Sequence, residues 1–138
     1  MSSTSYKCPE ISVWFVLSGE NLDPDLCTET LGIKPDKVWT QPAITAGTQP
    51  PRREWNIGFR RHEHNDIGEA IELVLARVWD KRDLLASLVA EKGYRVTVAC
   101  NVTLWKDRPL YELTENTIQR LAALGASFGL DIFPQDEE

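Results

Sequence analysis

The chain lacks the short motifs by which most enzyme classes are recognised. It has no Gly-x-Ser-x-Gly elbow, no phosphate-binding glycine loop, no dinucleotide fingerprint and no His-Glu-x-x-His zinc motif. Their absence does not exclude an enzyme, but it removes the sequence support for one. We therefore expect no catalytic residues and no cofactor, and an enzyme of unknown reaction ranks third among the functional hypotheses.

Cysteine is scarce and badly spaced for cross-linking. The three cysteines are far apart, and no Cys-x-x-Cys pair exists, so neither a disulfide framework nor a zinc knuckle is indicated. Cys27 and Cys100 fall on apolar faces and are expected to be buried, unreactive thiols.

Histidine is scarcer still, since the chain has only His62 and His64. Two residues apart on a strand, they would share a face and are weak candidates for metal ligands. The alternative that we favour is a solvated turn between a strand and a helix. We therefore predict no metal site.

Positive charge and long apolar runs are also in short supply. Fifteen basic against twenty-one acidic side chains give a net charge of -6, which disfavours binding to a phosphate backbone. The chain has no run of 18 apolar residues, the length that would indicate a membrane span. Its N-terminus lacks the apolar core of a signal peptide. We expect no nucleic-acid partner, no membrane partner and a cytoplasmic location.

What the chain does contain fits one folded unit. Its 138 residues, 42% hydrophobic and 26% charged, are typical of a single globular domain over residues 1–138. Residues 1–9 read as a loose N-terminal tail, residues 41–51 as a proline-rich loop and residues 134–138 as an acidic tail. Five tryptophans are many for this length and indicate apolar surface available to a partner.

The stretch from Asp66 to Gly93 is the organising segment. Apolar residues recur at helical spacing after Asp66, which is a good N-cap, and Gly93 is a natural C-terminal stop. The apolar stripe is interrupted at residues 79–83. This pattern predicts two helical pieces with a kink or break between them, and Asp80 as the cap of the second piece.

Regular structure is also predicted on both sides of this segment. Alternating residues predict strands over 11–18, 55–60, 94–104 and 128–132, and a shorter strand over 37–40. Capping residues and closing glycines predict helices over 23–32 and 114–125. In the second helix, Ile118, Leu121 and Leu124 are expected to form the inner face.

The helices over 23–32 and 114–125 each lie between two strands and each end in Leu-Gly. A pair of split strand-helix-strand units is the ferredoxin-like arrangement. The alternative is that the likeness reflects generic helix capping. We predict an α+β fold: a two-layer sandwich with ferredoxin-like split β-α-β repeats, a mixed or antiparallel sheet of four to five strands, and helices mainly on one face.

The order of landmarks resembles a known family. They are the Leu-Asp-Pro helix ending in Leu31-Gly32-Ile33-Lys34-Pro35, the Trp55 strand, the broken central helices and the closing Leu-Asp-Ile-Phe at 130–133. The chain, from about Ile11 to Phe133, is similar to the mostly bacterial domain-of-unknown-function family 4279. That resemblance implies no known activity and no catalytic residues.

A basic cluster stands out in the acidic chain. Arg52, Arg53, Arg60 and Arg61 lie close in sequence to Trp39 and Trp55. Trp39, Arg53, Trp55 and Arg60 are the candidate ligand- or partner-binding residues, because guanidinium and indole groups recognise anions and dominate interface hot spots. The alternative is that these arginines pair with the abundant carboxylates.

These observations favour a non-catalytic binding module, most simply a protein–protein interaction module of immunity-like or accessory type that masks a basic partner. The alternative is a small-ligand or anion-binding regulatory domain. The expected partner is an unknown protein or a small anionic ligand. A homodimer formed through an uncovered sheet face or edge is a further expectation.

Overall fold

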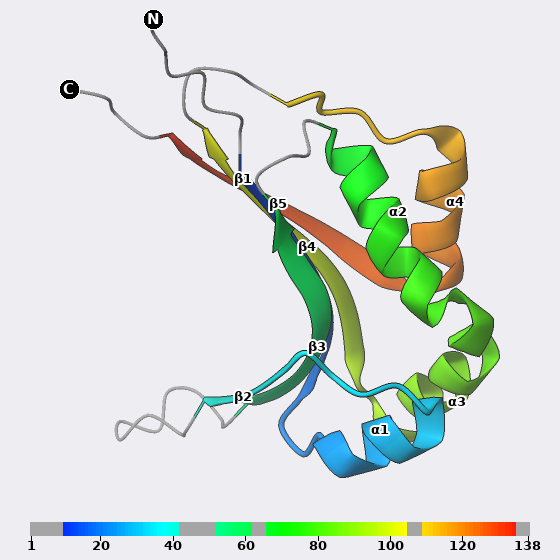
Figure 1. The fold of residues 1–138 in the computed structure, drawn as a ribbon. Helices are drawn as coiled ribbons and strands as arrows, with labels where there is room; N and C mark the ends of the chain where they lie inside the picture. The colour runs from blue at the N-terminus through cyan, green and yellow to red at the C-terminus, as the bar shows by residue number, and fades with distance from the viewer. Residues whose placement is uncertain (1–9, 42–51, 62–65, 105–108, 135–138) are drawn as a thin grey trace, which may run out of the picture.

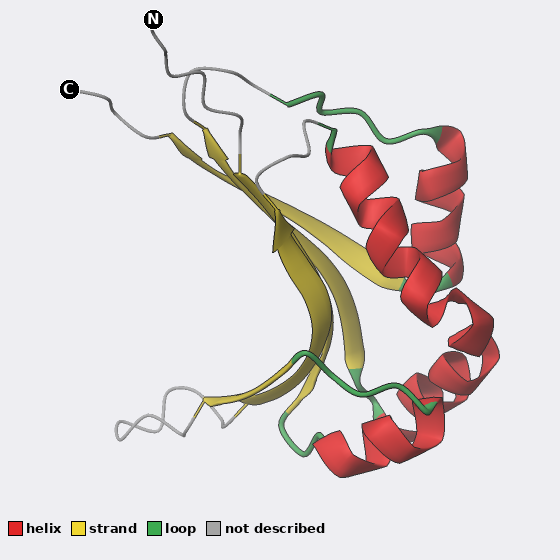
Figure 2. Ribbon diagram, viewed as in Figure 1, coloured by secondary structure: helices red, strands yellow, loops and turns green. Residues whose placement is uncertain are grey.

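One five-stranded sheet carries the helices of the described residues on one of its faces (Figures 1 and 2). The computed structural model describes residues 10–41, 52–61, 66–104 and 109–134. Its elements are β1 (Glu10–Gly19), α1 (Pro24–Leu31), β2 (Lys37–Gln41), β3 (Arg52–Arg61), α2 (Ile67–Val78), the 3-10 helix η1 (Trp79–Lys81), α3 (Arg82–Lys92), β4 (Arg95–Leu104), α4 (Glu115–Ala123) and β5 (Ala126–Pro134). The predicted tail 1–9 lies outside the described residues, as do the predicted loop apart from Gln41 and the acidic tail apart from Pro134.

The sheet order is β2-β3-β1-β4-β5. All neighbours are antiparallel except β4 and β5, which are parallel. The unit β1-α1-β2 is split by β3, and the unit from β3 through α2 and α3 to β4 is split by β1. Two interleaved split units are the ferredoxin-like arrangement, so the predicted fold class is confirmed.

The second split unit of the fold is not the one that the sequence predicted. The unit β4-α4-β5, which we paired with β1-α1-β2 as a repeat, is not split, because its two strands are direct neighbours. It extends the ferredoxin-like core by one helix and one edge strand. The shared Leu-Gly endings therefore reflect a common way of ending a helix.

The core lies between the sheet and the helices. Strict alternation in β1 turns Ile11, Val13, Phe15 and Leu17 towards the helices, and all four are fully buried. The corresponding row of β4 (Val96, Val98, Cys100 and Val102) is buried beside them. The helices cover these rows with apolar stripes, chiefly from α2. Burial of this shared surface is the main force that holds the two layers together.

The helix boundaries follow from local chemistry. Asp23 and Asp66 cap α1 and α2, each accepting backbone N–H bonds with its side chain. Gly32 and Gly93 end α1 and α3 at φ values of 67° and 72°, in the left-handed region that favours glycine.

The break in the central helical segment is confirmed, but its predicted cap is wrong. η1 separates α2 from α3, and Lys81, not Asp80, occupies the N-cap position of α3 without any side-chain hydrogen bond. Trp79 of η1 makes cation–π contacts with two guanidinium groups, with Arg82 at 4.7 Å and Arg120 at 5.3 Å from a ring centroid. These contacts link the break to α4.

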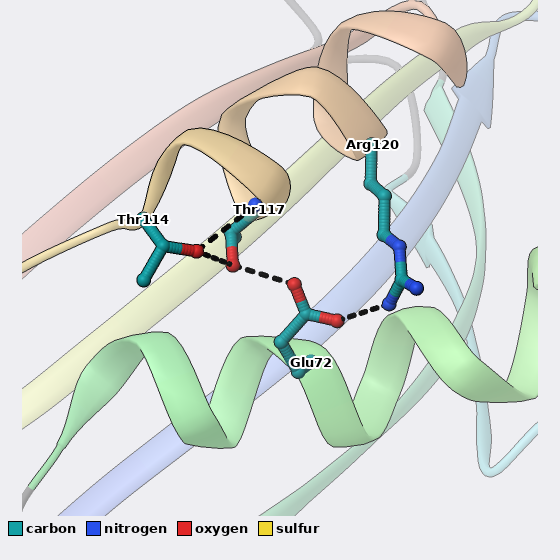
Figure 3. A network of polar contacts seen from close by, with 4 residues as sticks. All are labelled: Glu72, Thr114, Thr117 and Arg120. Atoms are coloured by element: carbon teal, nitrogen blue, oxygen red, sulfur yellow. Dashed lines mark hydrogen bonds and ion pairs between the residues drawn. The ribbon is translucent and has the colours of Figure 1, made fainter.

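The predicted inner face of α4 is correct for two of its three residues. Leu121 and Leu124 are buried, but Ile118 is 53% exposed and Thr117 is buried in its place. The hydroxyl of Thr117 donates a hydrogen bond to Glu72 of α2, whose carboxylate also pairs with Arg120 (Figure 3). This polar contact between α2 and α4 turns Thr117 inward and Ile118 outward.

A carboxylate anchors the short strand β2. Asp36 accepts hydrogen bonds from Gly58 N of β3 at 3.0 Å and from Arg77 of α2 at 2.7 Å. Partial burial by itself would raise the pKa of the Asp36 carboxyl, but these hydrogen bonds and the charge of Arg77 outweigh it and hold the pKa below its ordinary value. Asp36 therefore ties an edge of the sheet to the helical layer.

Candidate binding surfaces

The outer edge of β5 is the first candidate surface. β5 pairs with β4 on one side, and no other strand of the described residues pairs with it. An edge strand presents unpaired backbone N–H and C=O groups to any further strand. Nine residues make this a long edge.

The side chains of this edge are apolar on the helix side. Phe128, Leu130 and Ile132, here called the β5 row, lie in register with Val98, Cys100 and Val102 of β4. The β4 residues are buried, yet the β5 row remains 37–41% exposed. The helical layer therefore covers the edge strand only in part.

Two further apolar side chains are exposed in the segments on the same side of the fold. Ile118 of α4 is 53% exposed and Leu110, in the connection before α4, is 52% exposed. α4 is the helix that packs against β5. Contiguous exposed apolar residues mark interaction sites on soluble proteins, and the β5 row supplies three such residues on one strand.

The face of the sheet opposite the helices is the second candidate surface, here called the uncovered face (Figure 2). Trp14 of β1 lies in its centre, opposite Gly58 of β3. A Cβ atom on Gly58 would approach Trp14 Cε3 to 2.6 Å and would also meet the carbonyl oxygen of Val13. Glycine at this position thus allows the indole to lie flat across the neighbouring strand.

Two hollows flank Trp14 on this face, and both are also lined by Asn101. The first, of about 500 Å³, is lined by Glu10, Ser12, Arg60, Thr103 and Phe133 in addition. Its charges are balanced, since Arg60 Nε lies 2.9 Å from Glu10 Oε2. This pairing argues against a free cationic site for an anion here.

The second hollow, of about 360 Å³, is here called the Asn56 hollow, and its lining includes Trp14, Lys37, Glu54 and Asn56. Asn56 is only 6% exposed, and its Oδ1 has no hydrogen-bond partner. Its Nδ2 makes one long contact, 3.4 Å from Glu54 Oε1. Buried polar atoms are normally paired, so an unpaired amide oxygen beside a hollow is an exception that calls for an explanation.

The four residues predicted from the sequence do not come together. Register places Trp39 and Arg60 on the uncovered face, and Arg53 and Trp55 on the opposite face. Trp55 is fully buried, and its Nε1 donates to Thr28 Oγ1 at 3.0 Å. Trp55 is therefore a core residue, whereas Trp39, which is 39% exposed, remains available to a ligand.

The predicted weak metal candidates His62 and His64 lie outside the described residues. Within the ranges that the structure describes, no three His, Cys, Asp or Glu side chains are grouped to hold a metal ion. Cys27 and Cys100 are buried free thiols, as predicted. Burial raises the pKa of each to about 11, with Asp23 adding to the rise at Cys27, so both stay protonated at neutral pH.

The sequence contains a signal for one of the two surface features that it did not predict, Asn56, but not for the exposure of the β5 row. Asn56 alternates with Trp55 and Ile57 in β3, so the two-residue period alone places it on the face opposite the buried tryptophan. The β5 row was recognised as a strand. Its exposure follows from its position at the sheet edge, which no local pattern encodes.

Comparison with known proteins yields one match. The family model described as "Domain of unknown function (DUF4279)" matches residues 9–134. No curated protein and no solved structure matches the chain. Among the described residues, no helix is both long and apolar enough to cross a membrane.

Proposed function

The chain belongs to the DUF4279 family, and from that premise we propose that it is a non-catalytic protein-binding module whose binding surface is the edge of β5. The observation that carries the proposal is the β5 row, apolar and more than a third exposed, on a strand whose outer edge pairs with no other strand of the described residues. A partner strand added there would gain backbone hydrogen bonds and would cover this row.

The chemistry of the module favours a basic partner. The chain carries a net charge of -6, Asp131 lies within β5, and the sequence after β5 continues as Gln-Asp-Glu-Glu. A segment with alternating apolar residues and flanking lysine or arginine would match both the β5 row and the acidic residues around it. An accessory or immunity-like role, in which the module masks such a partner, is the specific form that we propose.

A cytoplasmic location forms part of the proposal. The buried thiols of Cys27 and Cys100 are unpaired. Unpaired cysteines fit a reducing compartment, where disulfides rarely persist.

The experiment is capture of partners from the native host's lysate with three baits. They are the wild type, Leu130→Lys in the β5 row, and Leu84→Lys, which alters a leucine of α3 that is 46% exposed. We expect a basic protein on the wild-type and Leu84→Lys baits, and its loss from the Leu130→Lys bait. A partner held equally by all three would contradict the proposed surface.

Light scattering of the purified protein tests whether a second copy of the chain, instead of another protein, binds to the β5 edge. The mass of a monomer would leave the β5 edge to the basic partner. A dimer that dissociates in the Leu130→Lys variant would support β5 as the binding surface but would contradict the proposal of a basic partner. The folding of each variant is checked by its thermal unfolding transition, so that loss of binding is not mistaken for loss of structure.

A further inference from the structure

The Asn56 hollow holds an acceptor that nothing in the described structure satisfies. Asn56 Oδ1 is buried without a donor. The long contact from Nδ2 to Glu54 holds the amide only weakly. A ligand group that reached this oxygen and donated a hydrogen bond to it would remove an unfavourable feature of the free protein.

The other groups of the hollow narrow the class of donor. The Glu54 carboxylate accepts hydrogen bonds and favours positive charge, while the Trp14 indole offers an aromatic surface. A guanidinium group is planar, cationic, rich in N–H donors and free of acceptors, and it stacks on aromatic rings. An anion that lacks hydrogen-bond donors would leave Asn56 Oδ1 unpaired, as would an apolar group.

Among the described residues that line the hollow, Lys37 is the one whose charge opposes a cation. It lies in β2 opposite Asn56, and its side chain is exposed. A lysine side chain is long and flexible, so its ammonium can move into solvent when another cation enters. Lys37 thus weakens the site without blocking it, and this makes it a useful position for a test.

We propose that the Asn56 hollow binds the guanidinium group of an arginine side chain from a bound polypeptide, with Asn56 Oδ1 and Glu54 as acceptors and Trp14 as the stacking surface. The choice of a polypeptide as the source rests on the proposed protein-binding function. The site lies on the uncovered face, so it is distinct from the β5 row. A partner that reached both surfaces would combine an added strand with one anchored arginine.

The test is a nuclear magnetic resonance titration of the whole protein with N-acetyl-arginine N-methylamide. We expect shifts of the Asn56 side-chain amide and Trp14 indole N–H resonances, with a millimolar dissociation constant. The matched lysine and citrulline amides test separately whether binding needs the planar guanidinium group and whether it needs the positive charge. Each is expected to bind at least tenfold more weakly, because lysine lacks the planar fork and citrulline lacks the charge.

Four variants assign the effect to this hollow. Asn56→Leu removes the acceptor and is expected to abolish the shifts at Trp14. Asn56→Asp, which adds a charged acceptor, and Lys37→Gln, which removes the opposing charge, are each expected to tighten binding several-fold. Arg95→Gln, on the uncovered face but outside both hollows, is expected to change nothing. Resonances remote from the hollow show whether each variant is folded.

Three results would overturn the inference: no shift with the arginine amide, equal binding of the citrulline amide, or undiminished binding by folded Asn56→Leu. Free L-arginine binding more tightly than the blocked amide would overturn the polypeptide source. A partner captured through β5 while the arginine amide fails to bind would overturn this inference alone. Arginine binding without any β5-dependent partner would overturn the proposed function alone.

Discussion

At the scale of single residues, Gly58 sets the shape of the uncovered face. It lies opposite Trp14 in the central strand pair, where any side chain would collide with the indole ring and with the backbone of β1. Because Trp14 lines both hollows, the absence of a side chain at Gly58 determines the position of the aromatic group in each.

We predict that Gly58→Ala lowers the free energy of unfolding by about 1–3 kcal/mol, the usual cost of overpacking a close contact. Urea denaturation measures the change. The matched control is Gly129→Ala in β5, where an added Cβ meets no atom within 4 Å. The control is expected to lie within about 0.5 kcal/mol of the wild type. Equal effects at the two positions would show that Trp14 does not lie against Gly58 in solution.

The buried thiols predict a stability loss at alkaline pH. In the folded protein the pKa values of Cys27 and Cys100 are about 11, compared with 9.0 for an unperturbed thiol. Below pH 9 both thiols are protonated in both states, and their contribution to stability is complete. Between about pH 9 and 11 the unfolded chain loses protons that the folded chain retains, so stability falls as pH rises.

The measurement is the unfolding free energy at pH 8 and at pH 10.5, for the wild type and for the Cys27→Ala/Cys100→Ala double variant. We expect a larger drop between the two pH values in the wild type, because both proteins share the other alkaline titrations. Equal drops would mean that the thiols are accessible to water in the folded state.

Residue positions also show what sequence alone can resolve. The alternation of residue types correctly predicts that Cys100 is buried and that β3 is a strand, because a two-residue period separates the two faces of a strand. It does not say which face the helices cover. Residue type alone therefore predicts Trp55 as a binding residue, although it lies in the core, and gives no signal for Asn56 beside it.

At the scale of elements, the contact between α2 and α4 depends on a small polar network. Glu72 accepts a hydrogen bond from Thr117 and pairs with Arg120, and its side chain is 28% exposed (Figure 3). Thr114 caps α4 and holds the backbone N–H of Thr117 at 3.2 Å. The network links the α4 cap to the middle of α2.

We predict that Glu72→Gln and Arg120→Met couple by about 1 kcal/mol in a double-mutant cycle, since both act on one ion pair. A control cycle of Glu72→Gln with Lys92→Met, at the far end of α3, is expected to show coupling below about 0.5 kcal/mol. Chemical denaturation of the single and double variants gives both values. Equal coupling in the two cycles would contradict a direct pair between Glu72 and Arg120.

Element types were predictable here because periodicity and caps are local signals. The helix break at η1 follows from the interrupted apolar stripe of the sequence. The identity of the cap and the outward position of Ile118 depend instead on contacts with distant residues, namely Arg120 with Trp79 and Glu72 with Thr117. Such tertiary contacts override local preferences and leave no local sequence pattern.

At the scale of the whole molecule, the extra unit after the ferredoxin-like core determines which surface is exposed. β5 adds a parallel edge strand next to β4, and the helical layer covers it only in part. The class of fold was predictable from the order of strands and helices. The strand order, and with it the exposed edge, was not, because pairing between distant strands is a tertiary property.

The most direct test of β5 as the binding surface is backbone hydrogen exchange in β5, measured with the protein alone and in complex with the partner captured from lysate. We predict that β5 amides facing away from β4 exchange rapidly in the free protein and become protected in the complex, because a partner strand accepts their hydrogen bonds. Unchanged exchange in β5, with new protection elsewhere on the described surface, would contradict it.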